Sequence, residues 1–137
     1  MRQYLIDTSV WVEFLNARPG AARARVRELA EEPGSIRTTE PVLMEVWSGA
    51  TGEELVRTER VLDRFDVLGV YPALDFRAAA DLYRGAKRRG YTVRSMVDCV
   101  IAAVALRNET ILLHRDRDFD VLAEIAPKLQ CESTIES

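Results

Sequence analysis

The sequence predicts an α/β domain with a mainly parallel sheet covered by helices on both faces. Short apolar runs that suit buried strands alternate with longer segments whose apolar residues recur every three to four positions, as in helices. The strand-like runs are apolar almost throughout, which is typical of parallel strands buried on both faces. The length of 137 residues suits one domain, so residues 1–137 are expected to form a single unit.

The composition excludes several broad classes of protein. Apolar residues make up 47% of the sequence and charged residues 30%, with a net charge of −3, which argues against binding nucleic acid by bulk positive charge alone. The start MRQYLIDTSV lacks the features of a signal peptide, and no run reaches the roughly 18 apolar residues of a membrane span. We therefore expect a cytoplasmic protein with no membrane partner. Cys99 and Cys131 lack a C-x-x-C spacing and are expected to be reduced packing residues.

The first third of the chain is predicted to contain a strand and two helices. Residues 3–7 form a short apolar run that suits a buried strand, and Thr8 or Ser9 can cap the amphipathic helix that follows. The Pro-Gly pair at 19–20 breaks that helix. Residues 21–32 then form a second helix, with its apolar side chains on one face.

The middle of the chain is predicted to add two strands and two helices. Pro41 suits the first turn of a helix that closes at Gly49 or Gly52. The helix after it has one apolar face, interrupted by the polar Thr58. The predicted ranges are strand 35–39, helix 41–50, helix 53–65 and strand 67–70.

The last part of the chain is predicted to contain three helices and one or two strands. An alanine-rich helix closes on Gly90, and the following helix carries the apolar run MVDCVIAAVAL. A buried strand and a short helix come next, and the chain closes with a candidate edge strand. The predicted ranges are helix 74–89, helix 92–108, strand 110–114, helix 119–125 and strand 129–131.

Asp98 is the most informative single residue, because it is the only charge in the run MVDCVIAAVAL. Burying a carboxylate is costly unless a cation, hydrogen-bond donors or a metal ion compensates it. Arg94 lies four residues earlier on the expected helix. However, an exposed pair in this order contributes only about 0.3–0.5 kcal/mol. Asp98 is therefore expected to need another partner.

Two further aspartates follow expected strands. Asp7 ends the first strand and Asp116 lies just after the strand at 110–114. Because sites in parallel sheets lie beyond the carboxyl ends of the strands, both side chains are expected to project toward one crevice. Together with Asp98 they suggest one metal site. His114 is the single histidine, so the metal ligands must be mainly oxygen, and His114 itself is expected to face solvent or a neighbour.

Each of these residues also has an interpretation without a metal. Asp7 can cap the helix after it, and Asp116 can do the same in the charged segment HRDRDFD. Glu45 can lie at the edge of a solvated helix face. Trp11 and Trp47 are interpreted as core or interface residues rather than as platforms for bases.

Four motifs in order resemble the PIN-domain family, in particular its VapC-type toxin ribonucleases. The motifs are YLIDTSVWVEFL, TTEPVLMEVWSGA, VDCVIAAVAL and TILLHRDRDFDVLA, and the resemblance spans residues 4 to about 125. It implies a PIN-like three-layer α/β/α sandwich with a central sheet of four to five strands. It further implies a metal-dependent endoribonuclease toxin that is inhibited by a cognate antitoxin, and a homodimer.

The resemblance assigns the acidic residues motif by motif. Asp7 corresponds to the aspartate after the first strand, Glu45 to the glutamate of the helix after the second strand, and Asp98 to the aspartate shortly before Ile-Ala-Ala. The fourth acid is Asp116 or Asp118. We favour Asp116, with Asp118 as a second ligand or a water-mediated contact.

The remaining expected site residues are polar or basic. Thr8 or Ser9 is expected to supply a hydroxyl near the metal, and Arg94, Arg115 and Arg117 are expected to hold RNA phosphates or to balance the charge of the site. Carboxylate oxygens suit Mg²⁺, which Mn²⁺ can replace. A water activated by the metal and a carboxylate would attack the phosphorus in line. The resemblance implies products with 5′ phosphate and 3′ hydroxyl ends.

Two other functions compete with this interpretation. A phosphatase or phospho-acceptor domain would use Asp7 as its nucleophile. Such phosphatases usually carry a second aspartate two positions on, where this chain has Ser9, and no suitable lysine follows a later strand. The other alternative is a non-catalytic module that binds RNA or protein. Such a module has no physical need to gather four like charges.

Overall fold

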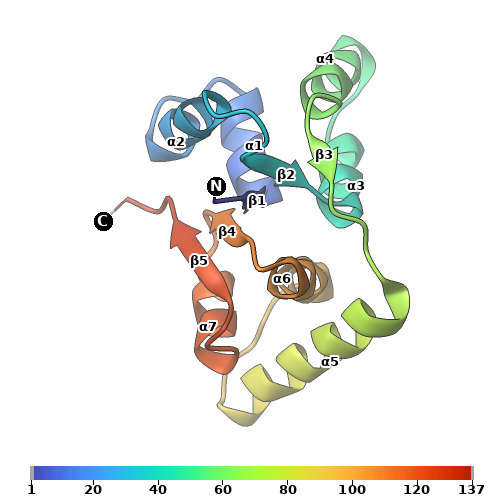
Figure 1. Cartoon of the computed structure of the whole chain (residues 1–137), viewed down its shortest axis with the longest axis vertical. Coiled ribbons are helices and arrows are strands. Elements are labelled where there is room, and N and C mark those ends of the chain that lie inside the picture. Colours follow the sequence, from blue (N-terminus) through green and yellow to red (C-terminus); the bar gives the residue numbers. More distant parts are fainter. Residues whose placement is uncertain (1, 137) are drawn as a thin grey trace.

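A five-stranded sheet crosses the computed structural model, which describes residues 2–136 (Figure 1). The strand order is β3-β2-β1-β4-β5, and every neighbouring pair is parallel. The predicted mainly parallel sheet is therefore confirmed, with no antiparallel pairing among its strands. The strands are β1 (Tyr4–Ile6), β2 (Ile36–Thr38), β3 (Asp66–Val67), β4 (Ile111–His114) and β5 (Gln130–Ser133).

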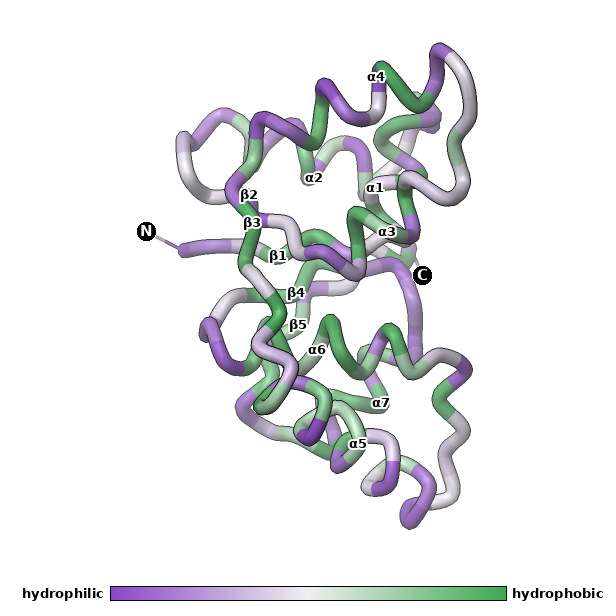
Figure 2. Tube along the Cα trace, turned by 90° about the vertical axis from the view of Figure 1, so that its right-hand side faces the viewer, coloured by the Kyte–Doolittle hydropathy of each residue, from purple (hydrophilic) through white to green (hydrophobic). Residues whose placement is uncertain are grey.

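Seven helices cover the sheet in residues 2–136. Figures 1 and 2 show α1, α2 and α4 on one side of the sheet and α5, α6 and α7 on the other, which confirms the predicted three-layer sandwich. Helix α3 contacts α1 on one side and α6 on the other. The helices are α1 (Thr8–Leu15), α2 (Ala21–Ala30), α3 (Glu40–Ser48), α4 (Gly52–Leu62), α5 (Pro72–Arg88), α6 (Met96–Asn108) and α7 (Arg117–Ile125).

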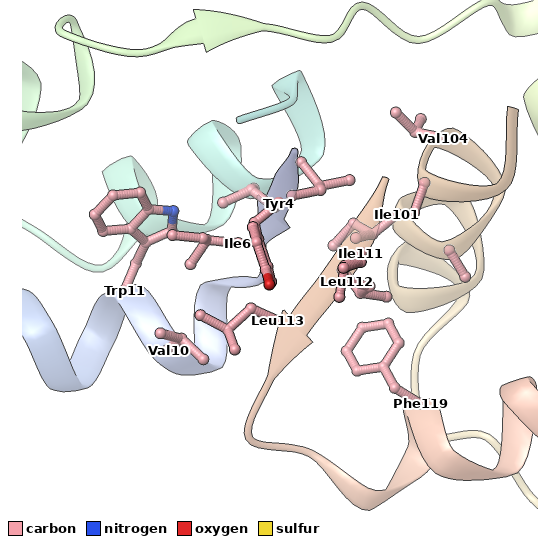
Figure 3. Packing of buried hydrophobic residues seen from close by; sticks show 14 of the residues in the cluster. Tyr4, Ile6, Val10, Trp11, Ile101, Val104, Ile111, Leu112, Leu113 and Phe119 are labelled. Atoms are coloured by element: carbon pink, nitrogen blue, oxygen red, sulfur yellow. The ribbon is translucent and has the colours of Figure 1, made fainter. Parts of the chain in front are cut away.

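The two central strands, β1 and β4, hold the core together. All residues of both strands are buried, as expected for parallel strands covered on both faces. Figure 3 shows Val10 and Trp11 of α1 on one side of these strands, and Ile101 of α6 and Phe119 of α7 on the other. In Figure 2 the same strands and the middle of α6 have the hydrophobic colour. Packing from both sides therefore holds the carboxyl ends of β1 and β4 in place.

The order of the strands places a crevice at the carboxyl ends of β1 and β4. The chain adds β2 and β3 on one side of β1, and then β4 and β5 on the other. Ligands in parallel sheets bind where the strand order reverses in this way. Ile6 pairs with Leu113 in the register of β1 and β4, so the residues after both strands emerge side by side.

Most predicted boundaries differ from the structure by one to four residues, and local contacts explain three of these differences. Helix α6 begins at Met96 rather than at residue 92, because the Ser95 hydroxyl accepts the Val97 N–H at 3.1 Å and caps the helix there. Helix α7 begins at Arg117 rather than at residue 119, because Asp116 caps it. The third strand covers only residues 66–67, since the Val70 N–H turns to Glu40 Oε1 at 2.9 Å and leaves the sheet.

Other expectations from the sequence hold in the structure. Cys99 and Cys131 are both free thiols. Trp11 is fully buried in the core, whereas Trp47 is 43% exposed. His114 is fully buried and its ring packs against Phe119. It therefore faces a neighbouring side chain, which was one of the two environments predicted for it, and not solvent. No helix within residues 2–136 combines the length and apolar content needed to cross a bilayer.

Candidate metal centre

Five carboxylates from distant parts of the chain meet at the carboxyl edge of the sheet. They form two groups that share Asp98: the first is Asp7, Glu45 and Asp98, and the second is Asp98, Asp116 and Asp118. Within each group, one oxygen atom from every residue lies within 4.8 Å of the others. All four acids predicted for the site are therefore brought together, and both candidates for the fourth position are present.

Asp7 is held by the start of the helix that follows it. Its Oδ2 accepts the Ser9 N–H at 2.9 Å and the Ser9 hydroxyl at 2.6 Å, so Asp7 does cap α1. Its Oδ1 is buried and has no hydrogen-bond partner among the described residues. A buried carboxylate oxygen normally has a partner. Capping therefore explains one oxygen of Asp7 and leaves the other unexplained.

Glu45 reaches the site from α3. The Thr8 hydroxyl donates a hydrogen bond of 2.8 Å to Glu45 Oε1. This bond links residues 37 positions apart and orients the Glu45 carboxylate toward Asp7 and Asp98. The interpretation of Glu45 as a residue at the edge of a solvated face is therefore incomplete, because its carboxylate belongs to the cluster.

Asp98 lies in the first turn of α6 and is 9% exposed. An ion pair between Asp98 and Arg94 was one interpretation of the sequence, and it is wrong. Arg94 precedes the cap at Ser95 and therefore lies outside the helix. The guanidinium of Arg94 instead contacts Asp116 and Asp118. Asp98 has no ion-pair partner among residues 2–136, as its apolar setting in the sequence suggested.

Asp116 and Asp118 follow β4 and open α7. Asp116 caps this helix by accepting the Asp118 N–H at 3.0 Å, and its own N–H donates to His114 Nδ1 at 3.1 Å. The two carboxylates are partly buried, with side chains 22% and 15% exposed. Both are therefore fixed in place by backbone contacts as well as by Arg94.

Burial and mutual repulsion raise two pKa values in the cluster. Burial, and then the charges of Asp7, Asp116, Glu45 and Asp118, raise the pKa of Asp98 from 3.8 to about 7. Burial also raises the pKa of Asp7 to about 6, with a further contribution from the Glu45 charge, although hydrogen bonds from Ser9 oppose the shift. Without a cation, the cluster therefore holds protons close to neutral pH.

The other expected site residues differ in what their side chains contact. The hydroxyls of Thr8 and Ser9 bond to Glu45 and Asp7, so both residues orient the acids. The guanidinium of Arg115 forms an ion pair with Glu13. Arg117 is exposed, and none of the ion pairs found within residues 2–136 involves it.

Glu13 was missed in the sequence, although a signal for it existed. It is the one charged residue in the apolar helix segment VWVEFL, just as Asp98 is in its own run. Its carboxylate contacts both Arg115 and Arg18, and so holds Arg115 beside the first turn of α1, where the Arg115 N–H donates to the Ser9 hydroxyl. Glu13 therefore supports the rim of the site.

The donor set fits a hard divalent cation. Mg²⁺ and Mn²⁺ prefer carboxylate oxygens, and the cluster offers such oxygens from five residues. The unpartnered Asp7 Oδ1 is the observation that favours a cation most directly. A bound cation would also offset the burial and the like charges that raise the pKa of Asp98. The candidate centre is therefore one for Mg²⁺ or Mn²⁺.

A parallel sheet with acids at its switch point, together with the motifs around them, defines a PIN domain. Residues 4–125 match the PIN domain family, and the chain belongs to it. The curated relatives agree with the expected VapC-type resemblance. Ribonuclease VapC11 of Mycobacterium tuberculosis is 49% identical over 123 residues, covering 88% of this chain and 92% of the relative.

One more distant relative and one solved structure are also similar to the chain. Ribonuclease VapC51 of M. tuberculosis is 34% identical to the chain, with 90% of this chain and 87% of the relative covered. Among solved structures, a toxin-antitoxin complex from Klebsiella pneumoniae matches with a TM-score of 0.74 at 20% identity. That match covers 98% of this chain and 100% of the other, and it supports the fold.

Removing the charge of Asp98 is predicted to stabilise the protein when no metal is present. Since the pKa of Asp98 is raised to about 7, the folded state binds a proton between pH 4 and 7 that the unfolded chain does not. The stability that this proton contributes is present below pH 4 and is lost as the pH rises through 7. Asp98→Asn should therefore be more stable than wild type at pH 8, by at least about 1 kcal/mol.

Urea unfolding in EDTA at pH 4.5 and pH 8 measures this difference. Asp63→Asn, which alters an exposed aspartate at the end of α4 and outside both groups, is the matched control and should change stability little at either pH. Asp98→Asn should raise the free energy of unfolding more at pH 8 than at pH 4.5. An increase that is no larger at pH 8 would contradict the raised pKa of Asp98.

Proposed function

We propose that the protein is a Mg²⁺- or Mn²⁺-dependent endoribonuclease and the toxic component of a toxin–antitoxin pair, with residues 1–137 acting as one nuclease domain. The observation that carries this proposal is the convergence of Asp7, Glu45 and Asp98, together with the buried Asp7 Oδ1, which has no hydrogen-bond partner among the described residues. The names of its relatives VapC11 and VapC51 support ribonuclease activity, and a ribonuclease of cellular RNA would act in the cytoplasm.

The residues of the first group would hold the metal ion. Asp7, Glu45 and Asp98 supply the ligands, and the hydroxyls of Thr8 and Ser9 keep two of these carboxylates oriented. When bound, the divalent ion would activate a water and neutralise charge on the scissile phosphate. Mn²⁺ is expected to substitute for Mg²⁺, because both prefer oxygen ligands.

The carboxylates of the second group are placed to accept a proton from the attacking water. Asp116 shares the cluster with Asp98, so its carboxylate is placed to accept a proton from the attacking water or to act as a further ligand. Asp118 also has a carboxylate oxygen within 4.8 Å of one of Asp98, so it is placed for either of these two roles, proton acceptor or metal ligand. We assign the fourth catalytic position to Asp116, because its side chain caps α7 and follows the central strand β4 directly.

Basic side chains at the rim would hold the RNA. Arg117 is exposed and forms none of the ion pairs found within residues 2–136, so its guanidinium is available for a phosphate. Arg94 and Arg115 already form ion pairs with acidic residues and would need to break these pairs before they could bind a phosphate. Neutralisation by the metal and by these arginines would allow a chain of net charge −3 to approach RNA.

The phosphatase alternative gains little from the geometry of Asp7. A nucleophilic aspartate needs a carboxylate oxygen open to the incoming phosphate. In this chain Asp7 is 3% exposed, its Oδ2 accepts two hydrogen bonds from Ser9, and its carboxylate lies close to those of Glu45 and Asp98. An incoming phosphate would meet negative charge at this position unless a cation were bound first.

We further propose that a cognate antitoxin inhibits the nuclease. The resemblance to VapC-type toxins supports this partner, and the structural match to the K. pneumoniae toxin-antitoxin complex covers nearly the whole chain. A nuclease of cellular RNA needs such control, because a toxin with metal bound would otherwise cleave the RNA of its own cell.

RNA cleavage after induction tests the catalytic assignment. Asp98→Asn and Asp7→Asn are each predicted to lower cleavage at least about 100-fold, because each removes a ligand from the metal. Sequencing of RNA ends in induced cells measures this, with new 5′ phosphate ends expected for wild type. The control Asp63→Asn should keep the wild-type cleavage pattern. Ends that persist in Asp7→Asn would contradict the proposal.

We also propose that the chain forms a homodimer through one apolar face, here called the α3–α5 face. It consists of Met44 and Trp47 of α3, Phe76 of α5, and Val97 and Val100 of α6 around a hollow of about 580 Å³. Met44, Trp47 and Phe76 are 53%, 43% and 56% exposed. Apolar patches of this kind mark interaction surfaces.

A second copy of the chain is the partner that suits the α3–α5 face best. A two-fold dimer sets the same surface against itself, so the surface must carry little charge. Glu40 is the one charged residue that lines the hollow, and its carboxylate accepts the Val70 N–H. Two copies can therefore meet there without repulsion between like charges.

Light scattering during size-exclusion chromatography tests the homodimer. The wild-type mass is predicted to be about twice the chain mass of 15.5 kDa, and Phe76→Glu is predicted to give the mass of one chain, because it buries a charge in the interface. Val56→Glu, at a position on α4 that is 51% exposed and outside the face, should remain dimeric. A monomeric wild type at about 50 µM, or a dimeric Phe76→Glu, would contradict the proposed interface.

A further inference from the structure

The two halves of the acidic cluster differ in how their charge is compensated. In the first group, Asp7 and Glu45 receive hydrogen bonds from Ser9 and Thr8, which are neutral. The ion pairs of residues 2–136 include none to Asp7, Glu45 or Asp98. In the second group, the Asp116 and Asp118 carboxylates share one guanidinium. The first group therefore lacks a cation and the second already has one.

Arg94 makes three contacts with the second group. Its guanidinium donates to Asp116 Oδ1 at 2.8 Å and to Asp118 Oδ2 at 3.2 Å, and its backbone N–H donates to the same Asp118 oxygen at 3.1 Å. The side chain bridges two carboxylates, although they stand 22 and 24 positions away in the sequence. A single residue thus holds both acids that open α7.

Local structure explains why Arg94 points to these acids. The Ser95 hydroxyl caps α6, so the backbone at Arg94 is not helical and its N–H is free to reach Asp118. Had the helix begun earlier, Arg94 would have lain on the same face as Asp98. The cap therefore directs the positive charge away from Asp98 and onto Asp116 and Asp118.

We propose that Arg94 is a positioning residue that acts as the resident counter-cation of Asp116 and Asp118 and thereby confines divalent-cation binding to the Asp7–Glu45–Asp98 group. This inference rests on the proposed metal-dependent function and deepens it. A divalent ion between Asp98, Asp116 and Asp118 would lie beside the guanidinium, and two like charges at such distances repel each other. The enzyme therefore binds one ion per chain while Arg94 is in place.

The second group becomes a second ion site once the guanidinium is removed. Arg94 is 73% exposed at its side chain, so its loss leaves no cavity in the core. The Arg94→Ala variant keeps all five carboxylates and both helix caps. It differs from wild type in the charge next to Asp116 and Asp118, and binding of a second ion then meets no local repulsion.

Counting bound Mn²⁺ by electron paramagnetic resonance, with calorimetry for affinity, tests the proposal without measuring RNA cleavage. Wild type is predicted to bind one Mn²⁺ per chain at 1 mM metal. Arg94→Ala is predicted to bind two, with the second at least about tenfold tighter than any second ion in wild type. Two Mn²⁺ ions bound a few ångströms apart would also broaden each other's electron paramagnetic resonance lines. Arg94→Lys, which keeps the charge, should restore binding of one ion.

The control Arg77→Ala removes the same charge from the exposed surface of α5, where Arg77 pairs with Asp81. It should bind one ion, as wild type does. Two ions in wild type, or one ion with unchanged affinity in a folded Arg94→Ala, would overturn the role of Arg94. A wild-type protein that binds no Mn²⁺ at all would instead overturn the proposed metal-dependent function. Thermal unfolding of each variant shows that it is folded.

Discussion

Repulsion among five carboxylates at one edge of the sheet governs the structure around the site. Asp98 takes part in both groups, and burial together with the neighbouring charges raises its pKa to about 7. Such an arrangement lowers the stability of the folded chain unless protons, hydrogen bonds or cations compensate the charge. Each kind of compensation is visible, in the raised pKa of Asp98, in the hydroxyls of Thr8 and Ser9, and in the guanidinium of Arg94.

The fold supplies the rigidity that this crowding requires. Strands β1 and β4 are buried on both faces and pair in parallel register, so Asp7 and Asp116 emerge from adjacent fixed points. Both aspartates cap the helices that follow them, which anchors their backbones as well as their side chains. Asp98 enters from α6 on the opposite layer. The sheet and the two capped helices therefore hold the backbones of Asp7 and Asp116 close together.

The sequence predicted those parts of the site that depend on local pattern. Asp7 and Asp116 could be placed because each follows an apolar strand, and Asp98 because it is the only charge in an apolar helix. The role of Arg94 could not be predicted, because its partner depends on where α6 begins, and the Ser95 cap moved that boundary by four residues. Likewise, the Thr8–Glu45 hydrogen bond depends on how α3 packs beside α1, which no local pattern encodes.

Anomalous diffraction from crystals soaked in MnCl₂ tests the central claim most directly, because it locates the cation among the carboxylates. Manganese scatters anomalously, so its position is found independently of any assumed ligand. The proposed metal centre predicts a peak within coordination distance of the carboxylate oxygens of Asp7 and Asp98, including the Asp7 Oδ1 that has no partner among the described residues. Crystals of wild-type protein that show no peak there, or a peak only at acids elsewhere on the surface, would contradict it.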